Sequence, residues 1–228
     1  MLFVEVMKLA VISVGGSILV PRGVDVHFLK KIKKLLLAEK NYRFVLCTGG
    51  GHTAREYIAA LKKEGLNEYT QDLVGIEVTK LNAKLLASFV QDCNQKIPEN
   101  LEEIKELLQT HRIVVVGGLS PGRTSDGTTA TIADYLDAEA IINMTNVAGL
   151  FDKDPRKHKG AKFIEKISHH DFGKMLARVK MQPGMHFVLD DVAAEICKNG
   201  NMKVVILQGV ENLKKYLGGK KFIGTVIE

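Results

Sequence analysis

The fold is decided by residues 113–127, which read IVVVGGLSPGRTSDG. The first four are apolar and β-branched, which is typical of a buried strand. A glycine-rich turn then leads into residues 128–136, whose apolar side chains suit one face of a helix. Free backbone N–H groups and the helix dipole favour an anion at such a helix start. The stretch therefore predicts an anion-binding turn between a strand and a helix.

This stretch almost matches a P-loop, in which a glycine-rich loop ends on Lys followed by Ser or Thr. Gly117 and Gly122 have the required spacing, but Arg123 stands where the lysine belongs. Pro121 also removes one amide donor from the loop, because proline has no N–H. We therefore predict a phosphate-binding loop outside the P-loop NTPases.

Strand and helix signals alternate along the whole chain. Strand-like apolar runs occupy residues 9–14, 44–47, 113–116, 140–144, 203–207 and 222–227. Helical spacing occupies residues 26–37, 52–63, 73–90, 101–108, 128–136, 169–177, 187–198 and 210–217. Apolar strands that alternate with helices are typical of a parallel sheet covered on both faces. In this α/β class, ligands bind beyond the carboxyl ends of the strands.

The composition limits the classes of function. A chain of 228 residues forms one large domain or two small lobes, and 46% apolar residues are typical of a globular protein. The formal net charge of +6 suits the collection of small anions. Because Lys and Arg are scattered and not interleaved with aromatic residues, we predict no nucleic-acid partner.

The cysteines and the first residues bear on the compartment. The three cysteines lie far apart and form no CxxC pair, so we expect reduced thiols in a cytoplasmic protein. Residues 1–6 lack a basic segment, so we expect no signal peptide, and Met7 is a second candidate start. No apolar run is long enough to cross a bilayer, so we predict no membrane partner.

Two further glycine turns follow predicted strands. Gly15-Gly16-Ser17 allows a phosphate to approach the backbone, although, taken alone, a simple tight turn explains it better. Gly49-Gly50-Gly51 costs more conformational entropy than a plain turn requires, which favours a binding role. Arg55 follows near the start of the next helix, where it either contacts phosphate oxygens or is a solvated surface charge.

Polar residues at other strand ends allow two interpretations each. Thr124, Ser125 and Asp126 are all good helix N-caps, and beside Arg123 they also suit an anion. Thr145 closes a strand, where it either forms an ordinary turn or reaches a ligand. Asp152 and Asp154 come after this strand. Their carboxylates could bind Mg²⁺ or a ribose, or they could form a turn before proline.

Competing chemistries lack their motifs. The seven histidines show no zinc-ligand spacing, so we predict no metal-ligating residues of the protein itself. There is no GxSxG nucleophile turn and no GxGxxG dinucleotide fingerprint. The glycine turns therefore indicate a site for two phosphorylated groups.

Taken in order, these motifs resemble the amino acid kinase family. The matching motifs are Val14-Gly15-Gly16-Ser17, Gly49-Gly50-Gly51 with Ala54-Arg55-Glu56-Tyr57, Gly117-Gly118 to Asp126, Thr145-Asn146-Val147-Ala148-Gly149-Leu150-Phe151 and Asp154-Pro155. Within the family the chain is most similar to the archaeal type of uridylate kinase. That resemblance includes Asp72-Leu73-Val74-Gly75-Ile76, Thr79 with Asn82-Ala83, and Gly224-Thr225-Val226-Ile227.

The resemblance implies a three-layer αβα sandwich with a mostly parallel central sheet, as one domain over residues 1–228. The N-terminal lobe, about 7–139, would hold the acceptor UMP, and the C-terminal lobe, about 140–228, would hold ATP. The implied activity is transfer of the γ-phosphate of ATP to UMP in pyrimidine nucleotide biosynthesis. Mg²⁺ would accompany ATP, and the family commonly assembles as homohexamers, trimers of dimers.

Matching positions imply the site residues. The UMP site would contain Gly50, Asp72, Leu119, Ser120, Pro121, Gly122, Arg123, Thr124 and Ser125. The ATP site would contain Gly15, Gly16, Gly51, Arg55, Thr145, Phe151 and Asp154. The residues expected to act on the transferred phosphate are Arg55, Gly16 and Ser17.

The chain departs from the family pattern at four positions. Ser13 stands where many members carry lysine, and His52 where archaeal uridylate kinases often have lysine. Ala148 replaces a frequent aspartate, and Phe151 a usual tyrosine. Two alternatives therefore remain: a relative that phosphorylates another small anion, such as a carboxylate or an isoprenoid phosphate, or a non-catalytic nucleotide- or oxyanion-binding protein on the same fold.

Overall fold

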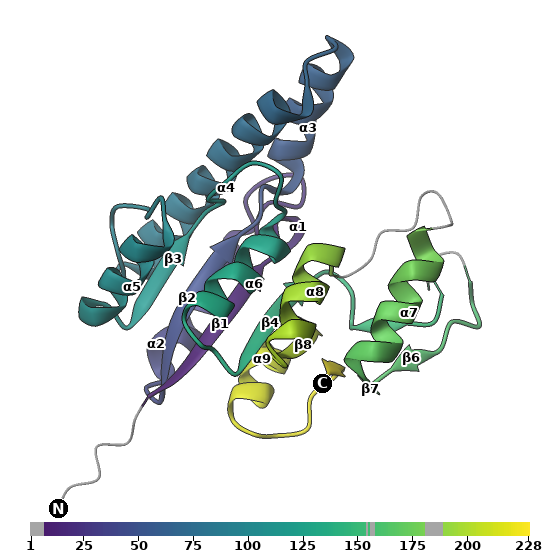
Figure 1. The fold of residues 1–228 in the computed structure, drawn as a ribbon. Helices are drawn as coiled ribbons and strands as arrows, with labels where there is room; N and C mark the ends of the chain where they lie inside the picture. Colours follow the sequence, from purple (N-terminus) through teal and green to yellow (C-terminus); the bar gives the residue numbers. More distant parts are fainter. Residues whose placement is uncertain (1–6, 154, 156–157, 181–188) are drawn as a thin grey trace, which may run out of the picture.

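A seven-stranded sheet forms the centre of the computed structural model, which describes residues 7–153, 155, 158–180 and 189–228 (Figure 1). The strand order is β3-β2-β1-β4-β8-β9-β7, and β5 pairs with β6 apart from this sheet. The strands are β1 Lys8–Val14, β2 Tyr42–Thr48, β3 Ile113–Val116, β4 Ala140–Thr145, β5 Leu150–Phe151, β6 Phe163–Ile164, β7 Lys166–Ile167, β8 Lys203–Gln208 and β9 Gly224–Ile227.

Helices cover both faces of the sheet. One face packs against α1 Gly16–Leu19, α2 Val26–Ala38, α4 Glu68–Val90 and α9 Val210–Leu217. The other packs against α5 Leu101–Thr110, α6 Ser125–Tyr135, α7 His169–Lys180 and α8 Asp191–Asn199. The remaining helix, α3 Gly51–Lys63, lies along α4 and reaches beyond the sheet with it (Figure 1).

The core follows from the alternation of strand side chains. In β1, Ile12 belongs to one buried cluster and Val11 to the other, because successive side chains of a strand point to opposite faces. Both faces are apolar, as expected for a sheet covered on both sides. The three-layer αβα sandwich is confirmed, while the lobe boundary near residue 139 stays a prediction.

Parallel pairing holds for neighbouring strands β3, β2, β1, β4 and β8, and β9 is the exception. A purely alternating pattern predicts a parallel last strand, but Gly224 pairs with Leu207 at the carboxyl end of β8. After α9 the chain reverses direction and runs back along that helix. There, Asn212 Oδ1 accepts a hydrogen bond from the amide of Ile223 at 3.0 Å. The strand β9 therefore starts where β8 ends and runs antiparallel to it.

Helix starts differ most from the predicted bounds. The helix expected from residue 128 begins at Ser125 after its cap Thr124, and the helix expected from residue 73 begins at Glu68. The helix expected from residue 187 begins at Asp191, and residues 187–188 lie outside the described residues. Short elements with too few residues for a periodic signal were missed, namely α1, β5, β6 and β7. None of the described helices is long and apolar enough to span a bilayer.

The edge strand β3 is completed by a side chain instead of another strand. Asn94 Oδ1 accepts from the amide of Val115 at 2.7 Å, and Asn94 Nδ2 donates to the carbonyl of Val115 at 2.9 Å. Asn94 is 1% exposed, so water does not replace these bonds. This amide therefore satisfies the backbone of the strand that ends at Val116, directly before Gly117.

We expect Asn94→Ala to lower the free energy of unfolding by about 2–4 kcal/mol, because it leaves two buried backbone groups of Val115 unpaired. Urea denaturation followed by circular dichroism measures the change. The control is Gln95→Ala, which removes an exposed neighbouring amide and should cost less than about 0.5 kcal/mol. Equal losses in both variants would contradict the assigned role of Asn94.

Candidate active site at the carboxyl edge of the sheet

The predicted site loops meet because their strands are neighbours. The strands β1, β2, β3 and β4 are adjacent and parallel, so their carboxyl ends lie along one edge of the sheet. The turns at 15–17, 49–51 and 117–118 and the end of β4 at Thr145 all follow these strands. The structure therefore places the predicted glycine turns side by side.

Two glycine turns touch through their backbones. A Cβ atom on Gly16 would lie 2.0 Å from the amide nitrogen of Gly51 and 2.7 Å from the carbonyl carbon of Gly49. Gly51 has a φ of +68°, which favours glycine, and its Cβ would lie 2.5 Å from the carbonyl oxygen of Gly16. Glycine is thus required here for close approach as well as for turning.

The helix α4 holds both the second turn and the loop after β3. Asn82 is 5% exposed, and its Nδ2 donates to the carbonyl oxygens of Gly49 and Gly50 at 2.8 and 3.2 Å. Thr79 Oγ1 accepts from the amide of Gly118 at 2.6 Å. These long-range contacts fix the 49–51 turn and the 117–124 loop to one rigid element.

The 117–124 loop is tied again near its tip. Asp72 Oδ2 of α4 accepts from the amide of Gly122 at 2.6 Å, and Gly122 has a φ of +79°. Thr124 Oγ1 accepts from the amides of Asp126 and Gly127, both at 3.1 Å, and so caps α6. The predicted UMP residue Asp72 therefore lies against the predicted UMP loop.

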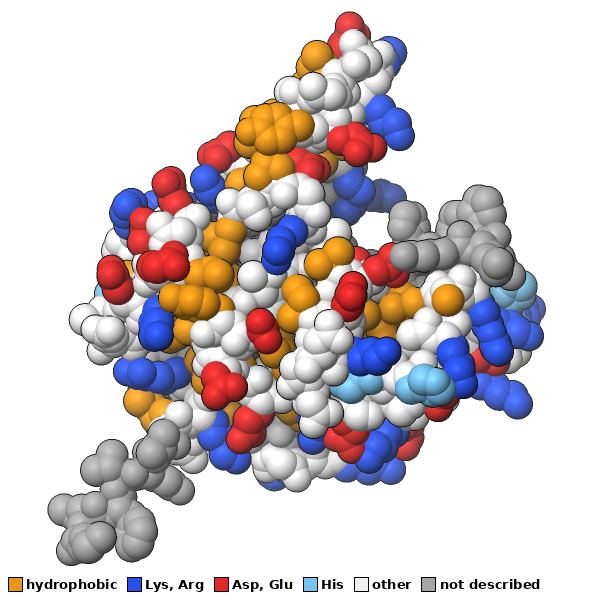
Figure 2. Space-filling model, in the orientation of Figure 1, with side chains coloured by type: hydrophobic (Ala, Val, Ile, Leu, Met, Phe, Trp, Pro, Cys, Tyr) orange, Lys and Arg blue, Asp and Glu red, His pale blue; other side chains and the backbone are white. Residues whose placement is uncertain are grey.

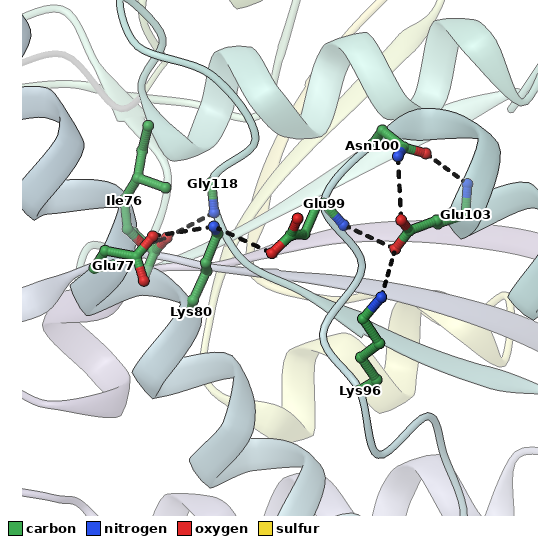
Figure 3. A network of polar contacts seen from close by, with 9 residues as sticks. Ile76, Glu77, Lys80, Lys96, Glu99, Asn100, Glu103 and Gly118 are labelled. Atoms are coloured by element: carbon green, nitrogen blue, oxygen red, sulfur yellow. Dashed lines mark hydrogen bonds and ion pairs between the residues drawn. The ribbon is translucent and has the colours of Figure 1, made fainter.

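A polar network supports this part of α4 (Figure 3). Lys80 Nζ lies 3.0 Å from Glu77 Oε1 and 4.0 Å from Glu99 Oε1, which joins α4 to the segment before α5. A Cβ on Gly117 would lie 2.8 Å from the backbone nitrogen of Lys80, so β3 ends directly against α4. The start of the 117–124 loop therefore packs against a part of α4 that these ion pairs connect to the segment before α5.

A carboxylate links three strand and helix ends. Asp126 lies in the first turn of α6, and its Oδ1 accepts from Ser13 Oγ of β1 at 2.9 Å. Its side chain also hydrogen bonds to that of Asn143 in β4. Burial raises the pKa of Asp126 to about 6, and the negative charge of Asp190 adds to this, whereas the hydrogen bonds from Ser13 and Asn143 oppose it.

The raised pKa of Asp126 predicts a pH effect on stability. Between about pH 4 and pH 6 the folded protein holds a proton on Asp126 that the unfolded chain releases, so this contribution to stability falls as pH rises. Above about pH 6 it is constant. In urea denaturation, the free energy of unfolding of wild type minus that of Asp126→Asn should decrease across this window.

The exposed Glu106→Gln variant is the control for this measurement, and its difference from wild type should vary much less between pH 4.5 and 7.5. A difference for Asp126→Asn that rises with pH would contradict the raised pKa.

Two of the predicted ATP residues, Thr145 and Phe151, lie at the end of β4 and in β5. Thr145 ends β4, and Phe151 packs edge to face on Phe163 with ring centroids 5.2 Å apart. Thr225 Oγ1 accepts from the amide of Leu150 at 2.8 Å and lies 2.6 Å from where a Cβ of Gly149 would be. The predicted ATP residue Asp154 lies outside the described residues.

The remaining predicted residues lie on the same loops. Gly50 is the N-cap of α3, Gly15 that of α1, and Ser17 lies within α1. The side chain of Arg55 is exposed on α3 and makes no hydrogen bond or ion pair with any described residue. The 117–124 loop and the start of α6 carry Leu119, Ser120, Pro121, Arg123 and Ser125. Ligand contacts of all these residues stay predictions.

Two residues of the site were missed by sequence reasoning. Asn143 lies inside an apolar strand, where a single polar residue among Ile142 and Met144 was the available signal. Asp190 caps α8 and contacts Thr124. The available signal was an aspartate, which is a good N-cap residue, within the stretch 187–198 that was predicted as a helix. Neither pattern reveals the residue contacted, because the partners are far away in sequence.

Within the described ranges, no group of three or more His, Cys, Asp or Glu side chains is arranged to hold a metal ion. Mg²⁺ in nucleotide sites is held by phosphate oxygens, water and few protein carboxylates, so such an ion fits this edge without a protein cage.

Comparisons with known proteins agree with this geometry. The model of the amino acid kinase family matches residues 8–208. A uridylate kinase of Thermoplasma volcanium is 35% identical over 219 residues, covering 96% of each chain, and one of Methanobrevibacter smithii is 36% identical over 222 residues, covering 95% of this chain and 97% of that protein.

Solved structures extend the likeness to three dimensions. The crystal structure of uridylate kinase from Archaeoglobus fulgidus has a TM-score of 0.83 and 33% identity, covering 97% of this chain and 100% of that one. A UMP kinase from Ureaplasma parvum, at 19% identity and a TM-score of 0.81, shares the fold. Because the family model spans most of the chain and several relatives exceed 30% identity over nearly their full length, the chain belongs to the amino acid kinase family.

Proposed function

We propose that the chain is a uridylate kinase, which transfers the γ-phosphate of ATP to UMP and releases UDP and ADP. The observation that carries this proposal is the contact between the Gly16 and Gly49–Gly51 turns beside the loop held by Asp72. Backbone amides of touching turns suit two phosphorylated ligands whose phosphates must meet. Relatives with this name, matched over nearly their whole length, support UMP as the acceptor.

In the proposed reaction, a phosphate oxygen of UMP attacks the γ-phosphorus of ATP, and the bond from that phosphorus to the β–γ bridging oxygen breaks. The protein supplies positioning and positive charge, since such transfers need little covalent help. We assign UMP to Asp72 and the 117–124 loop, and ATP to the 15–17 and 49–51 turns and the end of β4. Mg²⁺ bound with ATP would neutralise charge on the phosphates.

The departures from the family pattern limit where positive charge comes from. Ser13 stands where many family members carry lysine, and its hydroxyl is engaged by Asp126. His52, where archaeal uridylate kinases often have lysine, has its Nε2 atom 3.4 Å from Oε1 of Glu56 within α3. We therefore assign the positive charge on the transferred phosphate chiefly to Arg55, with help from Arg123 on the acceptor side.

An ADP-release assay with a panel of acceptors in the presence of Mg²⁺ tests the proposal. Turnover with UMP, and none with acetylglutamate or isopentenyl phosphate, is the expected result. Turnover with one of the other acceptors alone would identify a different kinase of the family. Saturable nucleotide binding without any turnover would indicate a binding protein on this fold.

An exposed apolar surface on α3 and α4 supports assembly into the implied homohexamer. Tyr57 of α3 is 54% exposed, and Leu73 and Leu81 of α4 are 42% and 65% exposed. Figure 2 shows hydrophobic side chains over these two helices. Tyr57, Leu73 and Leu81 line a hollow of about 320 Å³. Contiguous apolar patches of this kind mark interaction sites. We assign this surface to contact with a second copy of the chain.

Leu81→Glu is expected to break this contact, because it places a charge in the apolar surface. Light scattering at micromolar concentration should give the mass of the full assembly for wild type and a smaller mass for the variant. The control is Ile223→Glu, which changes an equally exposed residue, 60% against 65%, beside α9. An unchanged mass for Leu81→Glu would remove this surface from the assembly.

We also place the protein in the cytoplasm. Its three cysteines are free and buried, as expected for a chain that depends on no disulfide.

A further inference from the structure

The resemblance places Thr124 in the UMP loop. However, other groups of the protein occupy every hydrogen-bonding position of its hydroxyl. A threonine hydroxyl has one proton to donate and two lone pairs that accept. Both lone pairs serve the amides of Asp126 and Gly127, and the proton is donated to Asp190 Oδ2. The hydroxyl therefore has no hydrogen-bonding capacity left for a ligand, and its role is to hold the end of the loop.

The two carboxylate oxygens of Asp190 accept hydrogen bonds at the starts of two different helices. Oδ2 accepts from Thr124 at the start of α6, and Oδ1 accepts from the amide of Ala193 at 2.8 Å, which caps α8. The two helices pack closely, with Ala130 and Ala133 of α6 in the same buried cluster as Ala193 of α8. They lie side by side on one face of the sheet (Figure 1). One carboxylate thus joins the first turns of both helices.

The 117–124 loop has three attachment points. Its start is held by Thr79 and its tip by Asp72, both from α4 on one side of the loop. Asp190 provides the attachment on the opposite side, from the C-terminal part that carries Thr145 and Phe151. Without it, the side chains that contact residues 117–124 would come from α4 alone, and the loop would depend on α6, through Asp126, for its links to β1 and β4.

The choice of a carboxylate at this position has an electrostatic cost. The charge of Asp190 contributes to the raised pKa of the nearby Asp126, so the two negative charges repel. Serine or asparagine would cap α8 without that repulsion. The second carboxylate oxygen is the feature that those residues lack, and it is the one that Thr124 contacts.

We propose that Asp190 is a positioning residue for phosphoryl transfer, which acts through Thr124 to fix the UMP loop relative to the ATP-binding side of the site. This inference rests on the proposed uridylate kinase function. It assigns Asp190 no contact with either nucleotide. Its loss should therefore weaken UMP binding and alignment while leaving ATP binding unchanged.

The variant Asp190→Asn separates this role from capping. The amide oxygen of asparagine still accepts from Ala193 and caps α8, but its NH₂ group cannot accept the proton of Thr124. The matched control is Asp191→Asn, which removes the same charge from the first turn of the same helix. Both variants should unfold within about 3 °C of wild type.

Steady-state kinetics give the first readout. We expect Asp190→Asn to raise the KM for UMP about tenfold, with the KM for ATP within about twofold of wild type, and Asp191→Asn to change neither. A raised KM for ATP would show that Asp190 acts at the donor site and would overturn the proposal. Unchanged kinetics would reduce Asp190 to a helix cap.

Hydrogen exchange of the protein without ligands gives a second readout, which does not depend on the substrate. Amides of residues 118–127 should exchange at least about fivefold faster in Asp190→Asn than in wild type or Asp191→Asn. In the background Thr124→Val, adding Asp190→Asn should change exchange little further, because the contact is already lost. If wild type fails to phosphorylate UMP but exchange accelerates, the proposed function fails while the attachment stands; unaltered exchange overturns the attachment itself.

Discussion

Gly16→Ala is expected to lower kcat/KM for UMP phosphorylation by at least about 100-fold. The added methyl group would lie 2.0 Å from the amide nitrogen of Gly51, 2.6 Å from its Cα and 2.7 Å from the carbonyl carbon of Gly49. All three are backbone atoms of a turn held by Asn82, so no side chain can rotate away to make room. The two turns must separate by about 1 Å or more, and a displacement of that size costs about 100-fold in rate.

The ADP-release assay measures this loss, with activity expressed per folded molecule from circular dichroism. The matched control is Gly173→Ala, because a Cβ there meets no atom within 4 Å and Gly173 lies inside α7. It should leave the rate unchanged and raise the free energy of unfolding by about 0.5–1 kcal/mol. A Gly16→Ala protein that is folded and works at the wild-type rate would contradict the role given to this contact.

The periodic parts of the fold were predictable because they are local. The apolar run at residues 113–116 forms β3 with the predicted bounds, and the spacing at 210–217 gives α9 as expected. The direction of β9 was not predictable, since it depends on how the chain after α9 packs back along that helix through Asn212. The hydrophobic pattern of a strand is the same in either direction.

In the candidate site, too, local features were predictable and long-range contacts were not. Glycine turns after strands revealed the loops, because glycine permits close approach and unusual backbone angles. The links between loops were hidden: Ser13 contacts Asp126, 113 positions away, and Asn94 replaces a neighbouring strand beside Val115. Ser13 stood out only as a departure from a lysine. The structure adds that its hydroxyl holds the carboxylate at the start of α6.

Arg55→Ala is expected to lower kcat at least about tenfold, and up to about 1000-fold if Arg55 carries most of the positive charge on the transferred phosphate. The side chain is exposed and makes no hydrogen bond or ion pair with any described residue, so its removal should leave the midpoint of thermal unfolding within about 2 °C. Arg55→Lys should recover part of the rate, because lysine keeps the charge but not the planar fork that binds two phosphate oxygens at once. Lys62→Ala, which removes a positive charge from the last turn of the same helix, is the control and should stay within about twofold of wild type. Full activity of Arg55→Ala at saturating ATP and UMP would mean that backbone amides and Mg²⁺ stabilise the transferred phosphate without it, and the role assigned to Arg55 would be wrong.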